Sequence, residues 1–407
     1  MTLVLADILA PVTPERFFAE YYDKQPLHVR GGAAKFAQVL SWRGIDRLLD
    51  MTHAWSSQSL KLMLDGQPVP PEAFCSRANS RDAAPVQQPD ARKLRDWVAR
   101  GASLVMNDVD SLSPGLAAVS EALENAGLGK AQANVYVSFR SHKAFPAHFD
   151  THDVWAVQVE GEKTWNLWSG RAEWPIPHPA FRSLGQPHHE KAKGALREQV
   201  VLKAGDLLYL PRGWYHDALA EADASVHVAY GVNAALGMDL MSLLFERAVA
   251  EPMFRQPLPR QDGSTAASFA LNTRAAALGQ KLSELCRDPK VLDALARHVA
   301  EHRFHRGGVD LLGWRGLKTD GEVPAGADGP TFRVVAEGTK PVRRGAEWVL
   351  RAPAGALPLA PPEAEAAGWL LARREVNEEA LRAAHPAVDA PALLRRLAEA
   401  GLLAEAA

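Results

Sequence analysis

The stretch between about residues 131 and 235 constrains the fold most, because its pattern is that of short strands separated by turn residues. Residues 133–139 alternate between apolar and polar side chains with a period of two, as in a strand with one buried face. Similar runs follow at 154–160, 163–168, 199–202, 206–210 and 225–232. Many short strands joined by Gly- and Pro-containing turns indicate an antiparallel barrel or sandwich.

Two connections within this stretch carry further expectations. The tripeptide Glu160-Gly161-Glu162 separates two strand-like runs and predicts a β-hairpin. Residues 169–198 are polar, contain four prolines and predict a long loop, which in a compact domain is usually functional or mobile.

The flanking sequence has helical periodicity and divides the chain further. Helices are expected at 42–50, 92–100 and 114–126 before the strand region, and at 238–250 and 264–302 after it, with Pro289 splitting the last. From about residue 306, Gly-rich turns precede two strands, at 331–335 and 347–351, and two helices, at 362–373 and 390–400. We therefore predict an α+β chain with three domains, at 1–236, 237–305 and 306–407.

Composition narrows the class of protein. A chain of 407 residues with 47% hydrophobic and 23% charged residues is typical of a globular protein. The formal net charge of -2 argues against a protein that coats nucleic acid. Cys75 and Cys286 lie far apart in no metal-binding spacing, which indicates two reduced thiols. With no signal peptide and no apolar run that could cross a bilayer, a cytoplasmic location is expected.

Three residues predict a metal site. His148 and Asp150 are two positions apart, so on a strand both side chains would point to one face. A third ligand, His216, follows a strand-and-turn element with the pattern Gly-Asp-x4-Pro-x-Gly-x2-His. Two imidazoles and one carboxylate form the facial triad of non-heme Fe(II) oxygenases, although the same donors also bind Zn, Ni or Co.

These motifs resemble a known family. Residues 148–150 (HFD) and 158–165 (QVEGEKTW) resemble the core motif of the JmjC-type cupin oxygenases, and in particular of the ribosomal oxygenases. Residues 17–27 (FFAEYYDKQPL) and the domain order resemble the same group more loosely. The resemblance implies a double-stranded β-helix (jelly-roll) catalytic domain, a helical dimerisation unit and a C-terminal winged-helix domain.

The resemblance also implies Fe(II), 2-oxoglutarate as cosubstrate, and O2. In this group a basic residue pairs with the distal carboxylate of 2-oxoglutarate, and Lys163 stands at that position. Tyr136 stands where a tyrosine hydrogen-bonds the same carboxylate, and Asn134 shares its strand face. Trp165 has the parity of Lys163 and is expected in the barrel core.

One strand departs from the family pattern. Relatives usually carry hydroxyl residues after the third metal ligand, where this chain has Ala229 and Gly231. Ser225 and His227 are the remaining polar candidates there and are predicted, with Asp153, to contact substrate. For Asp153, capping of a strand is an equal alternative. Two further histidines, His142 and His152, flank the metal motif and are candidates for the mouth of the site.

The resemblance implies a dioxygenase that hydroxylates an Arg or His side chain of a ribosomal protein, in a chain that forms a homodimer and has no membrane partner. One alternative keeps the site and makes the enzyme a demethylase of N-methyl lysine or arginine. Another is a cupin that binds metal without turnover. A third is a nucleic-acid or protein-binding module, for which arginines at 373–374 and 395–396 are candidates, although they are more typical of a solvated helix face.

Overall fold

The computed structural model divides the chain into two compact units. One unit consists of Met1–Ala235 with His302–Gly307, and the other of Leu236–Glu301 with Gly308–Ala407. The prediction of three domains is not tested by this division. No helix among the described residues has the length and apolarity needed to cross a membrane. The residues that the structure describes are 3–51, 54–79, 85–139, 145–219, 224–304, 306, 331–335, 339–344, 347–352, 355–373 and 375–405.

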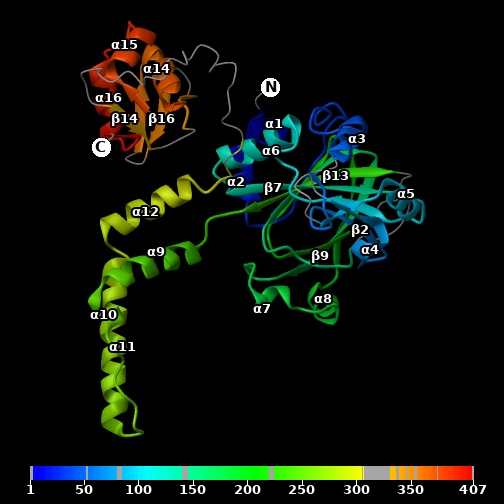
Figure 1. Ribbon diagram of the computed structural model, residues 1–407, viewed down its shortest axis with the longest axis horizontal. Helices are drawn as coiled ribbons and strands as arrows, with labels where there is room; N and C mark the ends of the chain where they lie inside the picture. The colour runs from blue at the N-terminus through cyan, green and yellow to red at the C-terminus, as the bar shows by residue number, and fades with distance from the viewer. Residues whose placement is uncertain are drawn as a thin grey trace. The chain divides into compact units, whose positions relative to one another are not determined.

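An antiparallel sheet of eight strands forms the centre of the first unit (Figure 1). Its strand order is β1-β11-β8-β13-β7-β6-β2-β3, so strands distant in sequence are neighbours. In chain order these strands are β1 (Leu27–Val29), β2 (Leu60–Leu64), β3 (Gln67–Pro68), β6 (Ser103–Met106), β7 (Lys130–Ser138), β8 (Asp153–Glu160), β11 (Leu207–Leu210) and β13 (Ser225–Asn233).

A second sheet, with the order β10-β9-β12, packs on this one. Its strands are β9 (Glu162–Arg171), β10 (Leu196–Lys203) and β12 (Trp214–Leu219). Apolar side chains of β8, such as Val154 and Ala156, form one buried cluster with Trp165 and Leu167 of β9. Two antiparallel sheets that share an apolar interior give the predicted double-stranded β-helix, and Trp165 lies in its core as expected.

Helices cover the outer face of the large sheet. The odd-numbered residues of β8, including Trp155 and Val157, join a core cluster with residues of the N-terminal helices. The Phe17 ring lies 5.1 Å from the Trp155 ring and 4.9 Å from the Tyr209 ring. The covering helices are α1 (Leu5–Leu9), α2 (Pro14–Glu20), α3 (Trp42–Asp50) and α6 (Pro114–Asn125). Further elements of this unit are α4 (Pro71–Phe74), α5 (Ala91–Ala99) and the pair β4 (Cys75–Asn79) and β5 (Pro85–Pro89).

The turn at Gly161 does not form the predicted hairpin. Strands β8 and β9 belong to different sheets, because both edges of β8 are already paired, with β11 and β13. Gly161 has a φ of 64°, and a Cβ at this position would lie 2.1 Å from the carbonyl oxygen of Ala224. The turn therefore carries the chain from one sheet to the other, and glycine is required there by both conformation and space.

The connection between β9 and β10 is more ordered than predicted. It contains α7 (Pro179–Arg182) and α8 (Gln186–Ala192), each with a proline in its first turn. The Nδ1 atom of His178 accepts a hydrogen bond from the amide of Ala180 at 3.2 Å and caps α7. Two of the prolines that predicted a loop therefore begin helices instead.

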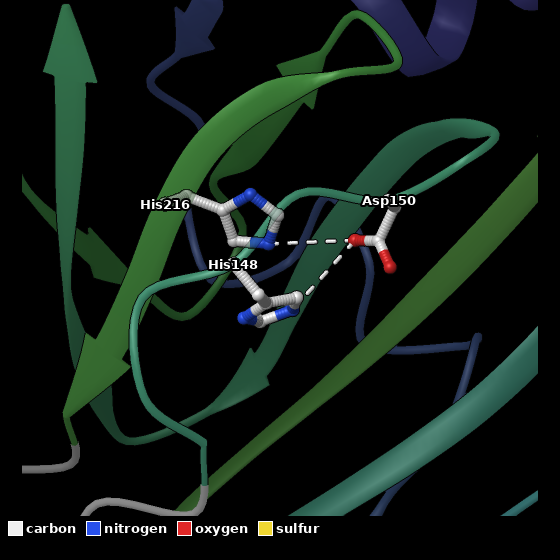
Figure 2. A group of neighbouring side chains, drawn as sticks. All are labelled: His148, Asp150 and His216. Carbon is white, nitrogen blue, oxygen red and sulfur yellow. Dashed lines mark ion pairs between the residues drawn. The ribbon is translucent and has the colours of Figure 1, made fainter. Parts of the chain in front are cut away.

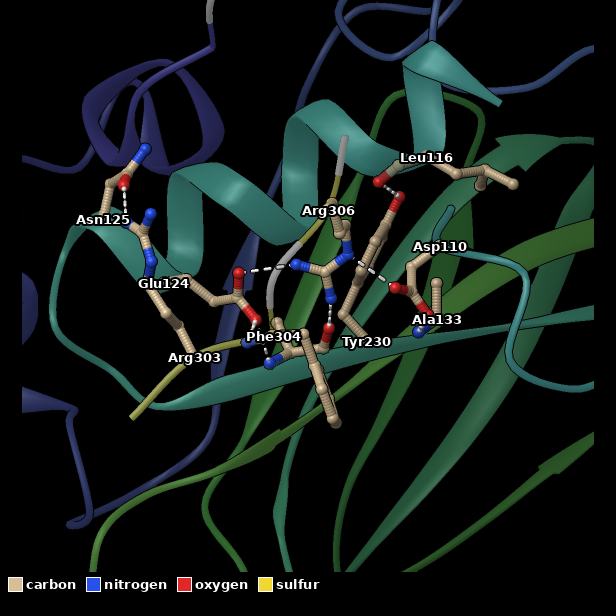
Figure 3. Close-up of polar contacts among 10 residues, drawn as sticks. Asp110, Leu116, Glu124, Asn125, Ala133, Tyr230, Arg303, Phe304 and Arg306 are labelled. Atoms are coloured by element: carbon tan, nitrogen blue, oxygen red, sulfur yellow. Dashed lines mark hydrogen bonds and ion pairs between the residues drawn. The ribbon is translucent and has the colours of Figure 1, made fainter. Parts of the chain in front are cut away.

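Arg306 belongs to the first unit, although it follows the helices of the second unit in sequence. Figure 3 shows its guanidinium beside Asp110 and Glu124. Its guanidinium, only 5% exposed, pairs with Asp110 and Glu124 at 2.5 Å each. It also donates a hydrogen bond to the carbonyl oxygen of Ala131 in β7. Burial opposes the charge of Arg306, but the two carboxylates outweigh burial and raise its pKa. The first unit is therefore not contiguous in sequence.

The second unit begins with helices. They are α9 (Gly237–Ala250), α10 (Pro252–Arg255), α11 (Thr265–Leu285) and α12 (Pro289–Ala300). Pro289 lies in the first turn of α12, so the predicted split of the long helical stretch is confirmed. Leu244 of α9, Leu285 of α11 and Val291 of α12 form a small buried cluster that holds these helices together.

The rest of the second unit is a small α+β fold with its own core of mainly Leu and Ala side chains. It contains one helix more than predicted, α15, while the winged-helix assignment stays a prediction. Its two sheets have the strand orders β18-β14-β19 and β15-β16-β17. The elements are β14 (Thr331–Val334), β15 (Val342–Arg344), β16 (Glu347–Ala352), β17 (Gly355–Leu359), α14 (Pro361–Leu371), β18 (Glu375–Asn377), α15 (Glu378–Ala384), α16 (Ala390–Glu399) and β19 (Leu403–Glu405).

Candidate metal centre and cosubstrate pocket

The three predicted metal ligands lie together (Figure 2). One potential ligand atom from each of His148, Asp150 and His216 lies within 4.8 Å of the others. The Oδ2 atom of Asp150 is 3.4 Å from Nε2 of His216 and 3.9 Å from Nε2 of His148. His216 belongs to β12, whereas His148 forms a single β-bridge with it and lies outside any regular strand. The predicted grouping is thus confirmed, although the expected strand for the first two ligands is not formed.

Hydrogen bonds orient both imidazoles. The Nδ1 atom of His148 lies 2.9 Å from the carbonyl oxygen of Pro146, and that of His216 lies 2.9 Å from the carbonyl oxygen of Trp214. A carbonyl oxygen can only accept, so each Nδ1 carries the proton and each Nε2 keeps its lone pair. Both lone pairs therefore face the carboxylate of Asp150, which is the arrangement that a bound cation needs.

The electrostatics of Asp150 and His216 favour the metal-binding protonation states of these two ligands. Burial by itself raises the pKa of the Asp150 carboxyl, but the charges of His152, His148 and His216 outweigh burial and leave the pKa below its ordinary value. Burial, followed by the charge of His148, lowers the pKa of His216 to about 4. Because metal ligands must be deprotonated, these two groups need lose no proton at neutral pH when a cation binds.

The turn before His216 explains the Pro-x-Gly part of the motif. Gly213 has a φ of 83°, and its amide donates a hydrogen bond to the carbonyl oxygen of Asp150 at 2.9 Å. A Cβ on Gly213 would lie 2.1 Å from the carbonyl oxygen of Ala172. Glycine thus allows the turn to approach the ligand segment closely enough to fix its backbone.

A buried lysine lies in the interior between the two sheets. Lys163 of β9 is 3% exposed, and its Nζ atom lies 3.4 Å from Oγ of Ser138 and 3.5 Å from Nδ1 of His227. Within the described part of the chain, no carboxylate acts on this ammonium, and burial lowers its pKa to about 7. A buried cation without a counter-charge is costly, so the position suits an anionic ligand such as a carboxylate.

Tyr136 and His227 form one wall beside Lys163. Their rings are stacked, with centroids 4.7 Å apart and planes 6° from parallel, and the Nζ atom of Lys163 lies 6.0 Å from the Tyr136 centroid. Burial raises the pKa of Tyr136, which keeps its hydroxyl group protonated as a donor. Burial, and then the charge of Lys163, lower the pKa of His227 and keep its ring neutral.

Asn134 has a different contact. Its Oδ1 atom accepts a hydrogen bond from the amide of Asp108 at 3.1 Å, and in the described residues no hydrogen bond joins it to Lys163. Asn134 and Tyr136 do share a face of β7, because their partners in β13 are Ala229 and His227. A role for Asn134 in cosubstrate binding therefore stays a prediction, with a turn contact as its observed use.

Three polar residues of the interior, Ser103, Ser138 and Gln158, were not predicted as site residues from the sequence. Ser138 contacts Lys163 and lies 3.1 Å from Ser103, Oγ to Oγ. Gln158 donates hydrogen bonds to Oγ of Ser225 at 2.9 Å and to the carbonyl oxygen of Glu160, whereas its buried Oε1 atom has no hydrogen-bond partner. The sequence held a signal for Ser138, since it is two positions after Tyr136 on the same strand face.

Asp153 lies away from this group. It is on the face of β8 that carries Trp155, and it accepts hydrogen bonds from the Tyr209 hydroxyl at 3.2 Å and from the amide of Arg212 at 2.9 Å. Burial raises the pKa of Asp153 to about 6. These contacts agree with the strand-capping alternative and give the substrate-contact alternative no support.

Trp165 connects the metal centre and the lysine. Its ring centroid lies 5.7 Å from that of His216 and 5.4 Å from that of His227. The triad and Lys163 therefore belong to one continuous interior wall.

His142, a candidate for the mouth of the site, lies outside the described residues, whereas His152 is described.

A two-sheet β-helix with two imidazoles and one carboxylate has the donor set expected of a metal-binding cupin, and its interior ammonium has no counter-charge among the described residues. The model of the JmjC domain family matches residues 112–240. The chain is similar to the JmjC-type cupin oxygenases, the class that includes the ribosomal oxygenases. Fe(II), 2-oxoglutarate and O2 are the cofactor and cosubstrates of this class, and the triad and Lys163 suit them.

Relatives from several organisms are similar to this chain. "Bifunctional lysine-specific demethylase and histidyl-hydroxylase NO66" of Drosophila persimilis is 27% identical over 270 residues, which are 63% of this chain and 36% of that protein. "Ribosomal oxygenase 1" of Danio rerio is 27% identical over 62% of this chain and 45% of that protein. "Uncharacterized protein YxbC" of Bacillus subtilis is 25% identical over 69% of this chain and 87% of that protein. The chain thus spans less than half the length of the first two.

Solved structures share the fold. The ribosomal oxygenase YcfD from Escherichia coli is similar with a TM-score of 0.51 and 15% identity, over 98% of this chain and 99% of that chain. A second structure of YcfD, in complex with cobalt and 2-oxoglutarate, has a TM-score of 0.50 over the same shares. At this level of identity the similarity concerns the fold.

Proposed function

We propose that this protein is an Fe(II)- and 2-oxoglutarate-dependent protein hydroxylase that acts on an Arg or His side chain of a ribosomal protein. The observation that carries the proposal is the buried Lys163 ammonium, which has no counter-charge among the described residues and lies on the interior wall that also carries the metal triad. The substrate class is supported by the names of the relatives, which include a histidyl-hydroxylase and ribosomal oxygenases.

Different residues of the chain would bind the metal and the cosubstrate. His148, Asp150 and His216 would hold the metal through two Nε2 atoms and one carboxylate oxygen. Lys163, with Tyr136 beside it, would bind the distal carboxylate of 2-oxoglutarate through charge and a hydroxyl donor. When bound, the metal, 2-oxoglutarate and O2 supply the oxidising power that inserts oxygen into a C–H bond. The apolar cluster around Trp165 and Leu167 excludes water from the interior.

A turnover experiment tests the proposal. The Fe(II)-loaded protein is incubated with 2-oxoglutarate, O2 and ribosomal proteins, and the products are analysed for succinate and for a single added oxygen by mass spectrometry. We expect both products, and neither with Asp150→Ala. Succinate without a modified ribosomal protein would contradict the substrate assignment. A wild-type protein that binds metal but forms no succinate would contradict the enzymatic proposal and favour a metal-binding cupin.

Demethylation is the second candidate activity, because the name of one group of relatives includes a lysine-specific demethylase. Hydroxylation of an N-methyl group releases formaldehyde, whereas hydroxylation of a ribosomal side chain does not. Formaldehyde release from a peptide with methylated lysine, without oxygen addition to ribosomal proteins, would favour this activity.

Nucleic-acid binding receives less support from the second unit. The Arg373 guanidinium lies 3.6 Å from the Trp369 ring centroid, and Arg396 pairs with Glu363 at 2.6 Å. Of the other two candidates, Arg395 is exposed and Arg374 lies outside the described residues. Two of the four arginines are therefore engaged within the unit rather than available for phosphates.

We further propose that the chain forms a homodimer through its helical region. Met238, Met241, Phe245 and Val249 of α9 recur every three or four residues and are 51–67% exposed, which places four large apolar side chains on one helix face. A second copy of the chain would bury this stripe. The predicted division into domains at 1–236, 237–305 and 306–407, the winged helix and the cytoplasmic location also remain proposals.

Light scattering coupled to gel filtration tests the dimer. Phe245→Glu places a charge in the exposed stripe and should yield a monomer. Ala250→Glu adds the same charge to an exposed position of α9 outside the stripe and should leave the dimer intact. A monomeric wild-type protein, or a Phe245→Glu variant that stays dimeric, would contradict the proposal.

A further inference from the structure

Two aromatic rings lie on the opposite side of the backbone from the metal ligands. His148 and His216 form an antiparallel β-bridge, so the next residues in register, Phe149 and Tyr215, place their side chains on the other face. Their ring centroids are 5.3 Å apart at an interplanar angle of 84°, and both side chains are buried. This aromatic pair therefore belongs to the same two backbone segments as the metal ligands.

Helix α8 covers the aromatic pair. The ring of His189 in α8 makes edge contacts with both members, at centroid distances of 5.5 Å from Phe149 and 5.7 Å from Tyr215. The Nδ1 atom of His189 lies 3.2 Å from the Tyr215 hydroxyl oxygen, within hydrogen-bond distance. At the start of the same helix, Nε2 of Gln186 donates a hydrogen bond to the carbonyl oxygen of Ala147 at 3.2 Å. The helix therefore contacts both segments that supply metal ligands.

The position of the Phe149 ring controls the direction of the ligands beside it. Main-chain hydrogen bonds hold the segment at His148 and at Asp150, and α8 holds the ring between them. Neighbouring side chains of an extended segment point to opposite sides, so a turn of the Phe149 ring would turn both ligands away from the metal. Contacts that keep this ring under α8 increase the population of the conformation that can bind metal, and the apparent affinity rises in proportion.

We propose that His189 is a positioning residue of the metal centre, which holds the two ligand segments from their outer side through Tyr215 and Phe149. The connection between β9 and β10, which contains α8, is then part of the metal site rather than a surface insertion. The inference rests on the metal-binding part of the proposed function and deepens it.

Substitutions at the hydrogen bond between His189 and Tyr215 test the proposal. Tyr215→Phe removes only the hydroxyl group, and His189→Phe keeps a ring but removes Nδ1. Each should weaken Mn²⁺ binding about 3–10-fold, which is the factor that a single hydrogen bond typically contributes. The double variant should lose about as much as either single variant, because both substitutions remove the same bond. His189→Gln supplies an amide that can bond to the hydroxyl group and should recover part of the affinity.

The measurement is electron paramagnetic resonance titration of the metal-free protein with Mn²⁺, which needs no turnover. His188→Phe makes the same change at an exposed position of α8 and is the matched control, which should bind Mn²⁺ as the wild-type protein does. Thermal unfolding of each metal-free variant separates a loss of metal affinity from a loss of fold. If His189→Phe does not fold, Tyr215→Phe, which removes a single oxygen atom, carries the test.

Two outcomes would overturn the inference. One is wild-type Mn²⁺ affinity in Tyr215→Phe, and the other is a double variant whose loss of binding free energy is the sum of the two single losses, since the two groups would then act separately. Failure of the wild-type protein itself to bind Mn²⁺ would instead overturn the proposed metal site.

Discussion

His148 and His216 are each other's backbone hydrogen-bond partners. The amide of His148 donates to the carbonyl oxygen of His216 at 3.0 Å, and the amide of His216 donates to that of His148 at 2.9 Å. This pair joins the segment before β8 to β12 and sets the separation of the two imidazoles without help from a bound cation. The metal site is thus preorganised by main-chain contacts that survive a change of side chain.

The first prediction follows from this backbone pairing, which does not depend on the side chains of the two histidines. His148→Ala should abolish metal-dependent turnover, yet change the thermal unfolding of the metal-free protein little, because the side chain is 32% exposed and the backbone pair remains. The check is succinate formation and Mn²⁺ titration, together with differential scanning calorimetry. His188→Ala, an exposed histidine of α8, is the control and should bind metal normally. Residual metal-dependent turnover in His148→Ala would argue against this residue as a ligand.

The second prediction concerns the lysine of the pocket. Lys163→Met should weaken 2-oxoglutarate binding about 10–100-fold, since a hydrogen bond to a charged group contributes about 1.5–3 kcal/mol. The ligand-free variant should also unfold at a higher temperature, because the substitution removes a buried ammonium for which the described residues supply no counter-charge. Calorimetric titration with 2-oxoglutarate in the presence of Mn²⁺ provides the measurement. Lys203→Met, on the exposed part of the neighbouring strand, should change neither quantity. An unchanged affinity in Lys163→Met would show that the carboxylate binds elsewhere.

The third prediction is a pH dependence. The Lys163 ammonium has a pKa of about 7 in the ligand-free protein, so the affinity for 2-oxoglutarate should decrease as the pH rises above about 7. At pH 8 binding should take up a proton, which calorimetry in buffers of different ionisation enthalpy can measure. Between about 7 and the ordinary lysine value of 10.5, the unfolded chain keeps the proton that the folded chain has lost, so this group makes the ligand-free protein more stable as the pH rises. Lys163→Met should remove both effects.

The fourth prediction concerns the buried ion pairs of Arg306. Arg306→Met leaves Asp110 and Glu124 without their counter-charge, so the free energy of unfolding of the first unit should decrease by about 3–5 kcal/mol. Arg303→Met, which removes one exposed hydrogen bond to Asn125, should cost less than about 1 kcal/mol. Urea unfolding followed by tryptophan fluorescence compares the two. Equal decreases in the free energy of unfolding for the two variants would mean that the Arg306 ion pairs do not stabilise the first unit.

Much of the metal centre could be predicted from sequence because its signals are local. The i, i+2 spacing of His148 and Asp150 and the Pro-x-Gly turn before His216 each fix the direction of the ligand side chains within a few residues. The role of Gly161 was not accessible in the same way. Strand alternation shows which residues share a face, but not which strands pair, and β8 is buried on both faces with both edges occupied.

The polar interior shows a second limit. Ser138 and Gln158 are small or neutral residues that alternation alone interprets as fillers of a buried face. The hydrogen bonds between Lys163 and Ser138 and between Gln158 and Ser225 became visible only in the structure. Asp153 shows the reverse, because proximity to the metal motif in sequence suggested a functional contact, whereas the register of β8 directs its side chain to the opposite face. The departure from the family pattern at Gly231 was visible in sequence. The proximity of the His152 ring, 2.4 Å from where a Cβ of residue 231 would lie, was not.

Arg306 has a consequence for the order in which the protein is made. Strand β13 completes the large sheet at Asn233, and the family match ends at residue 240, yet the cation that neutralises Asp110 and Glu124 comes only after Leu236–Glu301. During synthesis from the N-terminus, the first unit therefore has every strand that the structure describes in it, while Asp110 and Glu124 still lack their counter-charge. These two carboxylates are neutralised only when Arg306, which follows the helices of Leu236–Glu301, has also left the ribosome.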